Sequence, residues 1–362
     1  MPEALKDVYD QLFIERVATE FRKCHPAFNS AEFVARVFDE EWNDRELKAR
    51  MSHIRVCIHE ILNLPYPDAI KVLCEAAPEF RGYEALFFPD YVEAYGFDDW
   101  ETSIPALEWL TRFSSSELAV RPFILLDQER MMAQMQKWSR DENYHVRRLS
   151  SEGCRPRLPW AQALPEFKKD PSPILPILNQ LKQDSSDYVR RSVANNLNDI
   201  AKDNPEITIE WSKQNSGQHK DTDWIVKHAC RTLLKQAHPE VMALFGYNSD
   251  ENVQVEELLL NTPELKIGET LEFGFELQTA AGELGNIRLE YMIDYLKSNG
   301  SYNSKVFKIS EGVLNTSSKS VTAKQSFRQM STRTHYPGEH KLTVRVNGVN
   351  KAEASFQLLE NV

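Results

Sequence analysis

The sequence predicts a two-part protein, with an all-α array of helix pairs in residues 1–254 and a small all-β sandwich in residues 255–362. Two periodicities predict this division. Up to about residue 250 the apolar residues recur at helical spacing, and β-branched runs are few. From about residue 255 onward apolar and polar residues alternate, which is the period of a half-buried strand. A chain of 362 residues is long enough for about two domains.

The helical part contains a weak repeat centred on a valine. Residues 143–148 (NYHVRR) and 186–191 (SDYVRR) share it, residues 223–228 (DWIVKH) continue it, and residues 117–121 (ELAVR) look like an earlier copy. The valines are 26, 43 and 37 residues apart, in the range of two-helix repeats of the HEAT type. We expect the valines to point inward and the second helix of each pair to line a concave surface.

The last part of the chain predicts strands over residues 271–277, 287–295 and 342–346, where apolar and polar side chains alternate. Short turn signals stand between such runs. They are Asn299-Gly300, Pro337-Gly338 and Asn347-Gly348. A stretch of about 105 residues with this texture is typical of an Ig-like β-sandwich.

The net charge of −11 argues against a protein that coats nucleic acid, because Lys and Arg supply most phosphate binding. The charge is unevenly placed, however. Residues 1–100 hold 11 basic and 20 acidic side chains and residues 251–296 hold 2 and 10, whereas residues 121–191 hold 13 and 9 and residues 297–351 hold 10 and 2. Two basic stretches therefore remain available for a DNA partner.

Several classes of protein are not indicated. No apolar run approaches the roughly 20 residues of a membrane helix. The five cysteines are scattered without a CxxC pair, which suits reduced thiols in a cytoplasm, and the N-terminus does not read as a secretory leader. There is no HExxH, His53 with His59 is an unconvincing metal pair, and no glycine-rich phosphate loop appears. We therefore expect no metal and no cofactor.

Around the valines, charged and polar residues stand three or four positions from one another, so each second helix is expected to carry a polar face. The groups are Glu117 with Arg121, Arg148 with Glu152 and Arg155, and Arg191 with Asn195 and Asp199. Such pairs are usually solvated and contribute a few tenths of a kcal/mol. A scaffold that binds another protein in its concave face would show the same composition.

Four segments carry a resemblance to a known family. They are RPF at 121–123, WSRDENYHVRRLSSEG at 138–153, RPRLPW at 155–160 and DYVRRSVANNLNDI at 187–200. With them, residues 118–211 resemble the AlkC branch of the AlkC/AlkD DNA alkylation-repair glycosylases. The resemblance extends more weakly to the N-terminal helices and to the tail, since AlkC-type members carry an Ig-like domain after their HEAT-like repeats.

The resemblance implies a monofunctional DNA glycosylase, a monomer that acts on double-stranded DNA and initiates base excision repair. Such enzymes hydrolyse the N-glycosidic bond of cationic bases such as 3-methyladenine and 3-methylcytosine without drawing the base into a pocket, unlike most glycosylases. With the scattered thiols, we expect a cytoplasmic protein, associated with the bacterial nucleoid when bound to DNA. By position, Glu117, Glu152 and Asp199 match acidic residues around the lesion, and Trp160 matches an aromatic residue against the deoxyribose.

The chemistry is consistent with these residue types. A base alkylated at N3 is already positive, so it leaves without a general acid, and no catalytic lysine for a Schiff base is indicated. The oxocarbenium-like sugar needs negative charge and the water needs a base, and carboxylates supply both. We expect Glu152 and Asp199 to flank the sugar and orient the water, with Glu117 supporting them or the base. Trp160 would offer its π face to the sugar.

Each of these side chains also has a purely structural interpretation. Glu117 could pair with Arg121, Glu152 with Arg148 or Arg155, and Asp199 could end a helix near Lys202, while Trp160 could staple the next helix into the core. On that interpretation the chain would be a non-catalytic HEAT-repeat scaffold or DNA-binding protein with an Ig-like interaction module.

Phosphate contacts are expected from arginines, whose guanidinium is planar and bidentate, although some must pair with acids on adjacent repeats. The candidates are Arg121, Arg148, Arg155, Arg157, Arg190 and Arg191. In the β part, Lys305 and Lys308 stand with Lys319, Lys324, Arg328 and Arg333 in the basic stretch. These could reach DNA, or form a charged sandwich edge that resists aggregation.

Overall fold

The computed structural model describes residues 5–248, 252–280, 282–330 and 333–360. Residues 1–4, where the expectation about a leader begins, lie outside this description. By internal contacts the chain divides into two compact units, Met1–Ala229 and Cys230–Val362. No described helix is long and apolar enough to cross a membrane.

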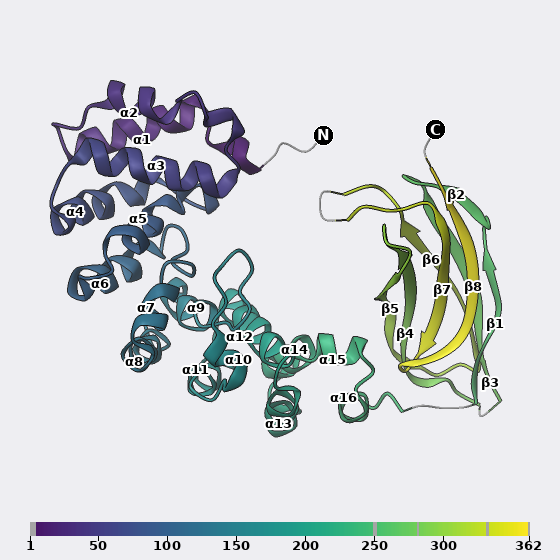
Figure 1. Cartoon of the computed structure of the whole chain (residues 1–362). Coiled ribbons are helices and arrows are strands. Elements are labelled where there is room, and N and C mark those ends of the chain that lie inside the picture. The colour runs from purple at the N-terminus through teal and green to yellow at the C-terminus, as the bar shows by residue number, and fades with distance from the viewer. Residues whose placement is uncertain (1–4, 249–251, 281, 331–332, 361–362) are drawn as a thin grey trace. The chain divides into compact units, whose positions relative to one another are not determined.

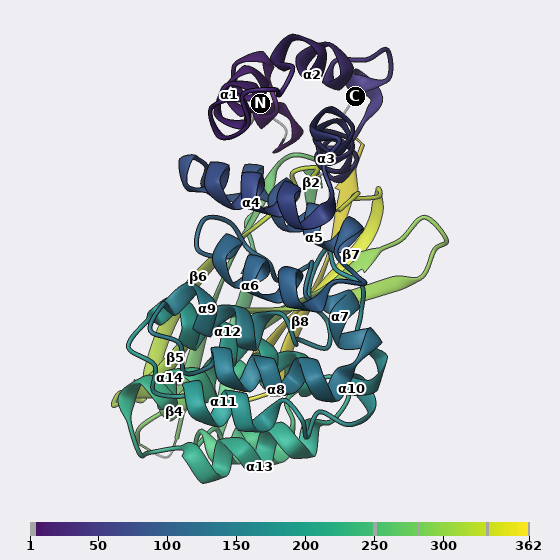
Figure 2. The ribbon, with the colours of Figure 1, turned by 90° about the vertical axis from the view of Figure 1, so that its left-hand side faces the viewer.

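The first unit is helical (Figure 1). Its helices are α1 (Gln11–Cys24), α2 (Ser30–Val37), α3 (Leu47–Leu62), α4 (Tyr66–Ala76), α5 (Phe87–Tyr95), α6 (Trp100–Leu110), α7 (Arg121–Leu126), α8 (Gln128–Trp138), α9 (Tyr144–Glu152), α10 (Pro165–Lys169), α11 (Leu175–Leu181), α12 (Asp187–Ile200), α13 (Pro205–Asn215) and α14 (Lys220–Ala229). Helices α9, α12 and α14 pack side by side, and α8, α11 and α13 form a second layer against them (Figure 2).

The repeat valines lie where the sequence placed them, in the interior. Val120, Val146 and Val189 are 0% exposed and Val226 is 1% exposed. Helix α9 begins after Asn143, whose side chain accepts the amide N–H of His145 as an N-cap. The segment 117–121 differs from the other copies, because α7 begins only at Arg121 and residues 117–120 form turns.

The second unit contains two short helices and two sheets. The elements are α15 (Arg231–Lys235), α16 (Pro239–Leu244), β1 (Val253–Leu260), β2 (Glu264–Lys266), β3 (Thr270–Thr279), β4 (Gly285–Leu296), β5 (Tyr302–Leu314), β6 (Ser318–Ser326), β7 (Gly338–Val346) and β8 (Val349–Leu359). The sheet orders are β1-β3-β6 and β2-β8-β7-β4-β5. Between them lies an apolar core that includes Phe273, Leu289 and Val344. The predicted fold class, a helical part followed by an Ig-like β part, is confirmed.

The turn at Asn347-Gly348 forms as its sequence predicts. Asn347 has φ 48° and Gly348 φ 81°, the left-handed conformation that a two-residue hairpin needs, and it joins β7 to β8. Strands β3, β4 and β7 contain the three segments predicted as strands.

Helices α15 and α16 belong to the compact unit of the sandwich. Arg345 donates to the carbonyl of Lys235 at 3.0 Å, and Asn286 donates to the carbonyl of Phe245 at 2.8 Å. The contact division therefore falls at 229/230, whereas strands begin at Val253. The domain boundary at 254/255 follows the change in secondary structure and remains a prediction about domain organisation.

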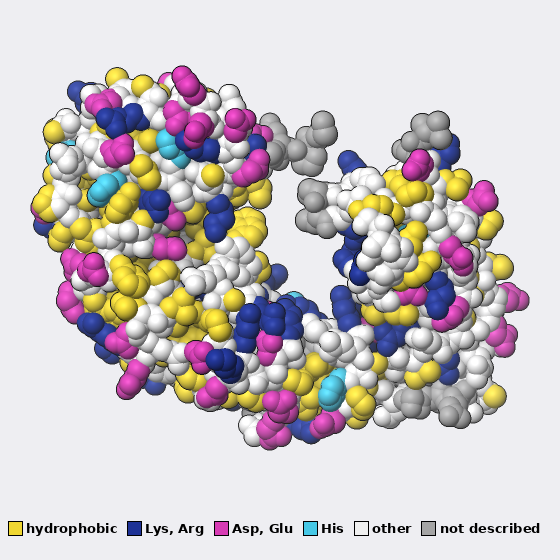
Figure 3. Space-filling model, viewed as in Figure 1, with side chains coloured by type: hydrophobic (Ala, Val, Ile, Leu, Met, Phe, Trp, Pro, Cys, Tyr) yellow, Lys and Arg dark blue, Asp and Glu magenta, His cyan; other side chains and the backbone are white. Residues whose placement is uncertain are grey.

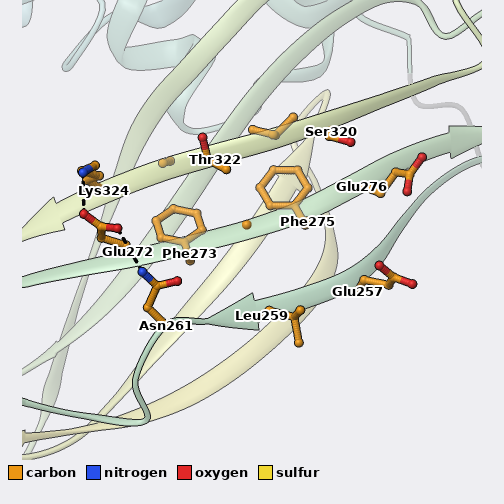
Figure 4. A pocket seen from close by; sticks show the side chains of 13 residues that line it. Glu257, Leu259, Asn261, Glu272, Phe273, Phe275, Glu276, Ser320, Thr322 and Lys324 are labelled. Carbon is orange, nitrogen blue, oxygen red and sulfur yellow. Dashed lines mark hydrogen bonds and ion pairs between the residues drawn. The ribbon is translucent and has the colours of Figure 1, made fainter.

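The outer face of the β1-β3-β6 sheet carries a hollow of about 620 Å³ (Figure 4). Gly274 lines it, between two strands that carry Glu257, Leu259 and Lys324. Glu272 accepts hydrogen bonds from Asn261, at 2.9 Å, and from Lys324. The carboxylate of Glu272 is thus already paired with neighbouring side chains that line the same hollow.

Gly153, directly after α9, lies where three segments approach closely. A Cβ there would stand 2.6 Å from a methyl group of Val120 and 3.0 Å from the carbonyl oxygen of Leu149. We predict that Gly153→Ala lowers the free energy of unfolding by about 1–3 kcal/mol, because a rigid core must move. Urea unfolding measures this. Adding Val120→Ala, which removes the clashing methyl group, should recover part of the loss, and an unchanged single variant would contradict the packing described.

Candidate active site

The predicted acidic residues come from three segments of the helical unit. Glu152 ends α9, Asp199 lies in the last turn of α12, and Glu117 lies in the turns before α7. Helices α9 and α12 are neighbours in one layer, so their C-terminal ends lie together. The structure thereby gathers all three carboxylates, although 82 residues separate the first from the last.

Ion pairs link these carboxylates into one chain of alternating charge. Arg155 donates to Glu152 Oε1 at 2.6 Å and to Asp199 Oδ2 at 2.8 Å. Arg148 hydrogen-bonds Glu117 and lies 3.4 Å from Glu152 Oε1. The complete charge chain, in order of contact, is Glu117, Arg148, Glu152, Arg155, Asp199 and Lys202.

The three carboxylates differ in how many of their oxygens already accept a hydrogen bond. Both arginines contact Oε1 of Glu152, and within the described chain Oε2 of that residue accepts no hydrogen bond. Glu117 Oε2 accepts hydrogen bonds from Ser115 Oγ, at 2.6 Å, and from Arg148. Oε1 of Glu117 has no donor within the described chain. Asp199 uses both oxygens, because Lys202 donates to Oδ1 at 3.0 Å. Glu117 and Glu152 can therefore each accept a further hydrogen bond.

The charge chain is largely withdrawn from solvent. Glu152 is 5% exposed and Asp199 is 1% exposed, so their charges depend on the adjacent guanidinium groups. Burial opposes the charge on Arg148, but Glu117 and Glu152 outweigh it and raise the pKa of this arginine. The arginines therefore stay charged at any physiological pH.

Trp160 projects from the loop between α9 and α10. Its side chain is 58% exposed and its φ is 66°, a left-handed backbone that is strained for a residue with a Cβ. The interpretation that it staples a helix into the core is therefore wrong. Leu158 and Leu164 of the same loop are buried instead and anchor it.

Trp160 lines two cavities. One, of about 320 Å³, is also lined by Ser115, Glu117, Arg148 and Tyr188. The other, of about 420 Å³, is lined by Lys48, Arg55, Asp90 and Glu93 from α3 and α5. Trp160 therefore belongs both to a cavity that reaches the charge chain and to a second polar cavity that α3 and α5 help to line.

Comparison with known proteins agrees with this architecture. A family model described as DNA alkylation repair enzyme matches residues 94–233, and one described as "Uncharacterised protein YhaZ, C-terminal Ig-like domain" matches residues 254–360. The "Uncharacterized protein YhaZ" of Bacillus subtilis (strain 168) is 46% identical over 355 residues, 98% of this chain and 99% of YhaZ.

A solved structure matches the whole chain. The Pseudomonas fluorescens alkylpurine DNA glycosylase AlkC, bound to DNA containing an abasic site analog, is similar with a TM-score of 0.94 and 38% identity, covering 99% of this chain and 100% of that one. The chain belongs to the AlkC family of DNA alkylation-repair enzymes. The resemblance seen in the sequence is thus confirmed.

In this AlkC-family chain, the prediction that Arg121 and Arg155 contact phosphate is wrong, because both side chains are buried. Arg121 is 1% exposed and donates to the carbonyls of Gly153 and Arg155 at 2.9 Å and of Gln162 at 2.6 Å. Burial lowers its pKa to about 10. Arg155 is 7% exposed and occupied by two carboxylates. Neither guanidinium is placed to meet a phosphate, because both hold parts of the site together.

The other predicted basic residues keep more exposure, and Figure 3 shows Lys and Arg side chains gathered over α12 and α14. Their contacts are mostly with acids. Arg157 pairs with Asp203 at 2.5 Å, Arg190 donates to the carbonyl of Asp184 at 2.7 Å, Arg191 pairs with Asp187 at 2.7 Å, and Lys308 pairs with Glu311 at 2.9 Å. Lys305 is exposed on β5. Phosphate contacts by these residues remain a prediction.

The structure adds residues that the sequence did not single out. Tyr188 belongs to the sequence repeat without being a predicted site residue, and the guanidinium of Arg148 stacks over its ring, 4.7 Å from the ring centre. Ser115 donates to Glu117, but nothing in the sequence marked it. Lys48 contacts the Trp160 loop from 112 residues away, which no local pattern could show. Among the residues that the structure describes, no three His, Cys, Asp or Glu side chains are arranged to hold a metal.

The buried bridge made by Arg155 should contribute far more to the free energy of unfolding than an exposed ion pair does. We predict that Arg155→Met lowers the free energy of unfolding by about 3–5 kcal/mol, because two buried carboxylates lose their shared cation. Arg157→Met is the matched control. Its pair with Asp203 leaves the arginine side chain 40% exposed, so we expect about 0–1 kcal/mol. Equal losses in urea unfolding would contradict the assignment of Arg155 as the central bridge.

Glu93 gives a pH-dependent prediction. Burial, and then the charge of Asp90, raise the pKa of Glu93. A raised carboxyl pKa means that the folded state binds the proton more tightly, so stability is lost as pH rises through the folded pKa. Gln cannot ionise, and Glu93→Gln should therefore gain thermal stability over the wild type as the pH rises above about 4.3, the ordinary pKa of a glutamate. Glu129→Gln, exposed on α8, should show no such trend. A difference in melting temperature that is constant with pH would contradict the burial argument.

Proposed function

We propose that this chain is a monofunctional DNA glycosylase that hydrolyses the N-glycosidic bond of cationic alkylated bases, 3-methyladenine and 3-methylcytosine, in duplex DNA and so initiates base excision repair. The observation that carries the proposal is the charge chain. It holds Glu117 and Glu152 with one oxygen each unpaired, and Glu117 shares a cavity with the exposed indole of Trp160. Membership of the AlkC family supports the reaction class.

The chemistry requires this distribution of charge rather than a proton donor. A base alkylated at N3 carries a positive charge and departs as a neutral molecule when its bond to the sugar breaks. The positive charge then passes to the sugar, which carboxylate oxygens stabilise. A water must lose a proton as it attacks the sugar carbon, and a carboxylate with a free oxygen accepts it.

We propose that these roles are divided among the acids according to their contacts. In our proposal Glu152 accepts the hydrogen bond from the water through Oε2, since Oε1 is held by Arg155. Asp199 holds Arg155 and so orients Glu152, rather than touching the water itself. Glu117, whose side chain is 20% exposed, presents Oε1 to the sugar or the cationic base. Trp160 places its π face against the sugar.

The exposure of the site suits a lesion that stays in the duplex. Trp160 is 58% exposed and projects from a loop, so a sugar at the surface of DNA can reach it without extrusion of the base. The proposed partner is double-stranded DNA, bound by a monomer. Arg157 and Arg191, whose side chains are 40% and 59% exposed, are the best placed of the predicted phosphate contacts in the helical unit.

We predict that purified protein releases 3-methyladenine from methylated duplex DNA, and that Glu152→Gln slows this release at least about 100-fold. The amide keeps the size of the side chain but loses its charge and its basicity. Single-turnover release measured by chromatography and mass spectrometry tests this, and DNA affinity should change little. Glu166→Gln is the matched control, because the side chain of that glutamate is 65% exposed on α10 and forms an ion pair with the exposed Lys169.

The outcomes separate the two function classes. Release by the wild type that is lost in Glu152→Gln while DNA binding persists excludes a non-catalytic scaffold. DNA binding without any release by the wild type would instead mean a DNA-binding protein, and the proposed activity would be abandoned. Full activity of Glu152→Gln would move the water-activating role to Glu117.

A further inference from the structure

We infer that Lys48 is a positioning residue for the reaction, because it holds the peptide carbonyl of Trp160 and thereby fixes the indole between the two cavities. The inference rests on the proposed function for its consequence in catalysis. The contact between Lys48 and Trp160 is independent of the proposed function. Lys48 Nζ donates to the carbonyl oxygen of Trp160 at 2.9 Å.

The base of the Trp160 loop is already fixed by other groups. Arg121 donates to carbonyls on both sides of the tip, those of Arg155 and Gln162. The amide of Leu164 donates to the carbonyl of Pro156 at 3.3 Å, which closes the loop across its base. These contacts fix where the loop starts and ends. In the peptide group that follows Trp160, the N–H of Ala161 donates to the carbonyl of Leu158 at a long 3.4 Å, and the carbonyl is the group that Lys48 holds.

The tip itself needs a restraint. Trp160 has φ 66°, a conformation that residues with a Cβ avoid, and the residue is 58% exposed, so packing alone does not hold it. In the described structure, Lys48 is the donor to the Trp160 carbonyl, and an ammonium donor makes a stronger hydrogen bond than a neutral one. The lysine therefore stabilises the peptide orientation from which the indole projects.

The position of Lys48 is itself set by charge. It lies in the first turn of α3 and lines the second cavity together with Asp90 and Glu93 of α5. The positive charge of Lys48 acts on both carboxylates, which are partly buried there. The acids attract the ammonium group to this side of Trp160. The N-terminal helices, which supply none of the predicted site residues, thus reach the carbonyl of Trp160 through the Lys48 hydrogen bond.

The kinetic test is a double-mutant cycle between Lys48 and Trp160. We expect Lys48→Met to slow single-turnover base release about tenfold, because misplacement of a positioned group costs rate. Affinity for DNA should change little, and any loss of thermal stability should be small, since Lys48 is exposed. Lys48→Arg, which can still donate, should keep most of the activity. Lys71→Met, at an exposed lysine of α4 that pairs with Asp68, is the matched control and should have no effect.

The cycle decides whether Lys48 acts through the indole. In a Trp160→Ala background, Lys48→Met should cause no further loss, because the group that it positions is gone. Equal losses in the two backgrounds would overturn the inference, as would full activity of Lys48→Met.

A second measurement does not depend on activity. The indole N–H resonance of Trp160, assigned by its absence in Trp160→Phe, should shift or broaden in Lys48→Met while the resonances of the other tryptophans stay in place. An unchanged resonance would overturn the positioning role. Absence of base release by the wild type would instead contradict the proposed function, so the two failures are distinguishable.

Discussion

The bridge from Arg155 to Glu152 and Asp199 is the interaction on which the helical unit's site depends. Both carboxylates are buried at the ends of neighbouring helices, where an uncompensated charge would be strongly unfavourable. One guanidinium with two donors in a fixed plane satisfies both at 2.6 Å and 2.8 Å. The same contact ties the end of α9 to the end of α12, so the packing of two repeats and the placement of the acids have a common cause.

The repeat motif also has a physical explanation in the structure. Arg148 of α9 lies 4.7 Å from the ring centre of Tyr188 at the start of α12, and Arg191 of α12 lies 6.0 Å from that of Trp224 on α14. Each arginine thus covers the aromatic residue of the next repeat. The aromatic–valine–arginine pattern records a contact between successive helices, with the valine buried beneath it.

The sequence predicted what depends on local periodicity. The alternating segments became β3, β4 and β7, and the valine repeat marked α9, α12 and α14, because burial on one face leaves a periodic trace. It was misleading where a contact crosses between segments. The structural interpretation that pairs Glu117 with Arg121 assumes a helix, but residues 117–120 form turns and Glu117 pairs with Arg148 instead. Arg121 is of the residue type that binds phosphate, and only its hydrogen bonds to three backbone carbonyls show that it is buried in the helical unit.

The alternation of signs along the charge chain has a consequence for how DNA approaches. Three carboxylates face three cations, so the formal sum of the chain is zero. At distances beyond about 10 Å such a set has almost no field, and the phosphate backbone meets no net repulsion from it. At contact distance the individual oxygens are still anionic. Under the proposed function, the site therefore neither attracts nor repels the polyanion at a distance, and it favours positive charge only when a sugar or base touches it.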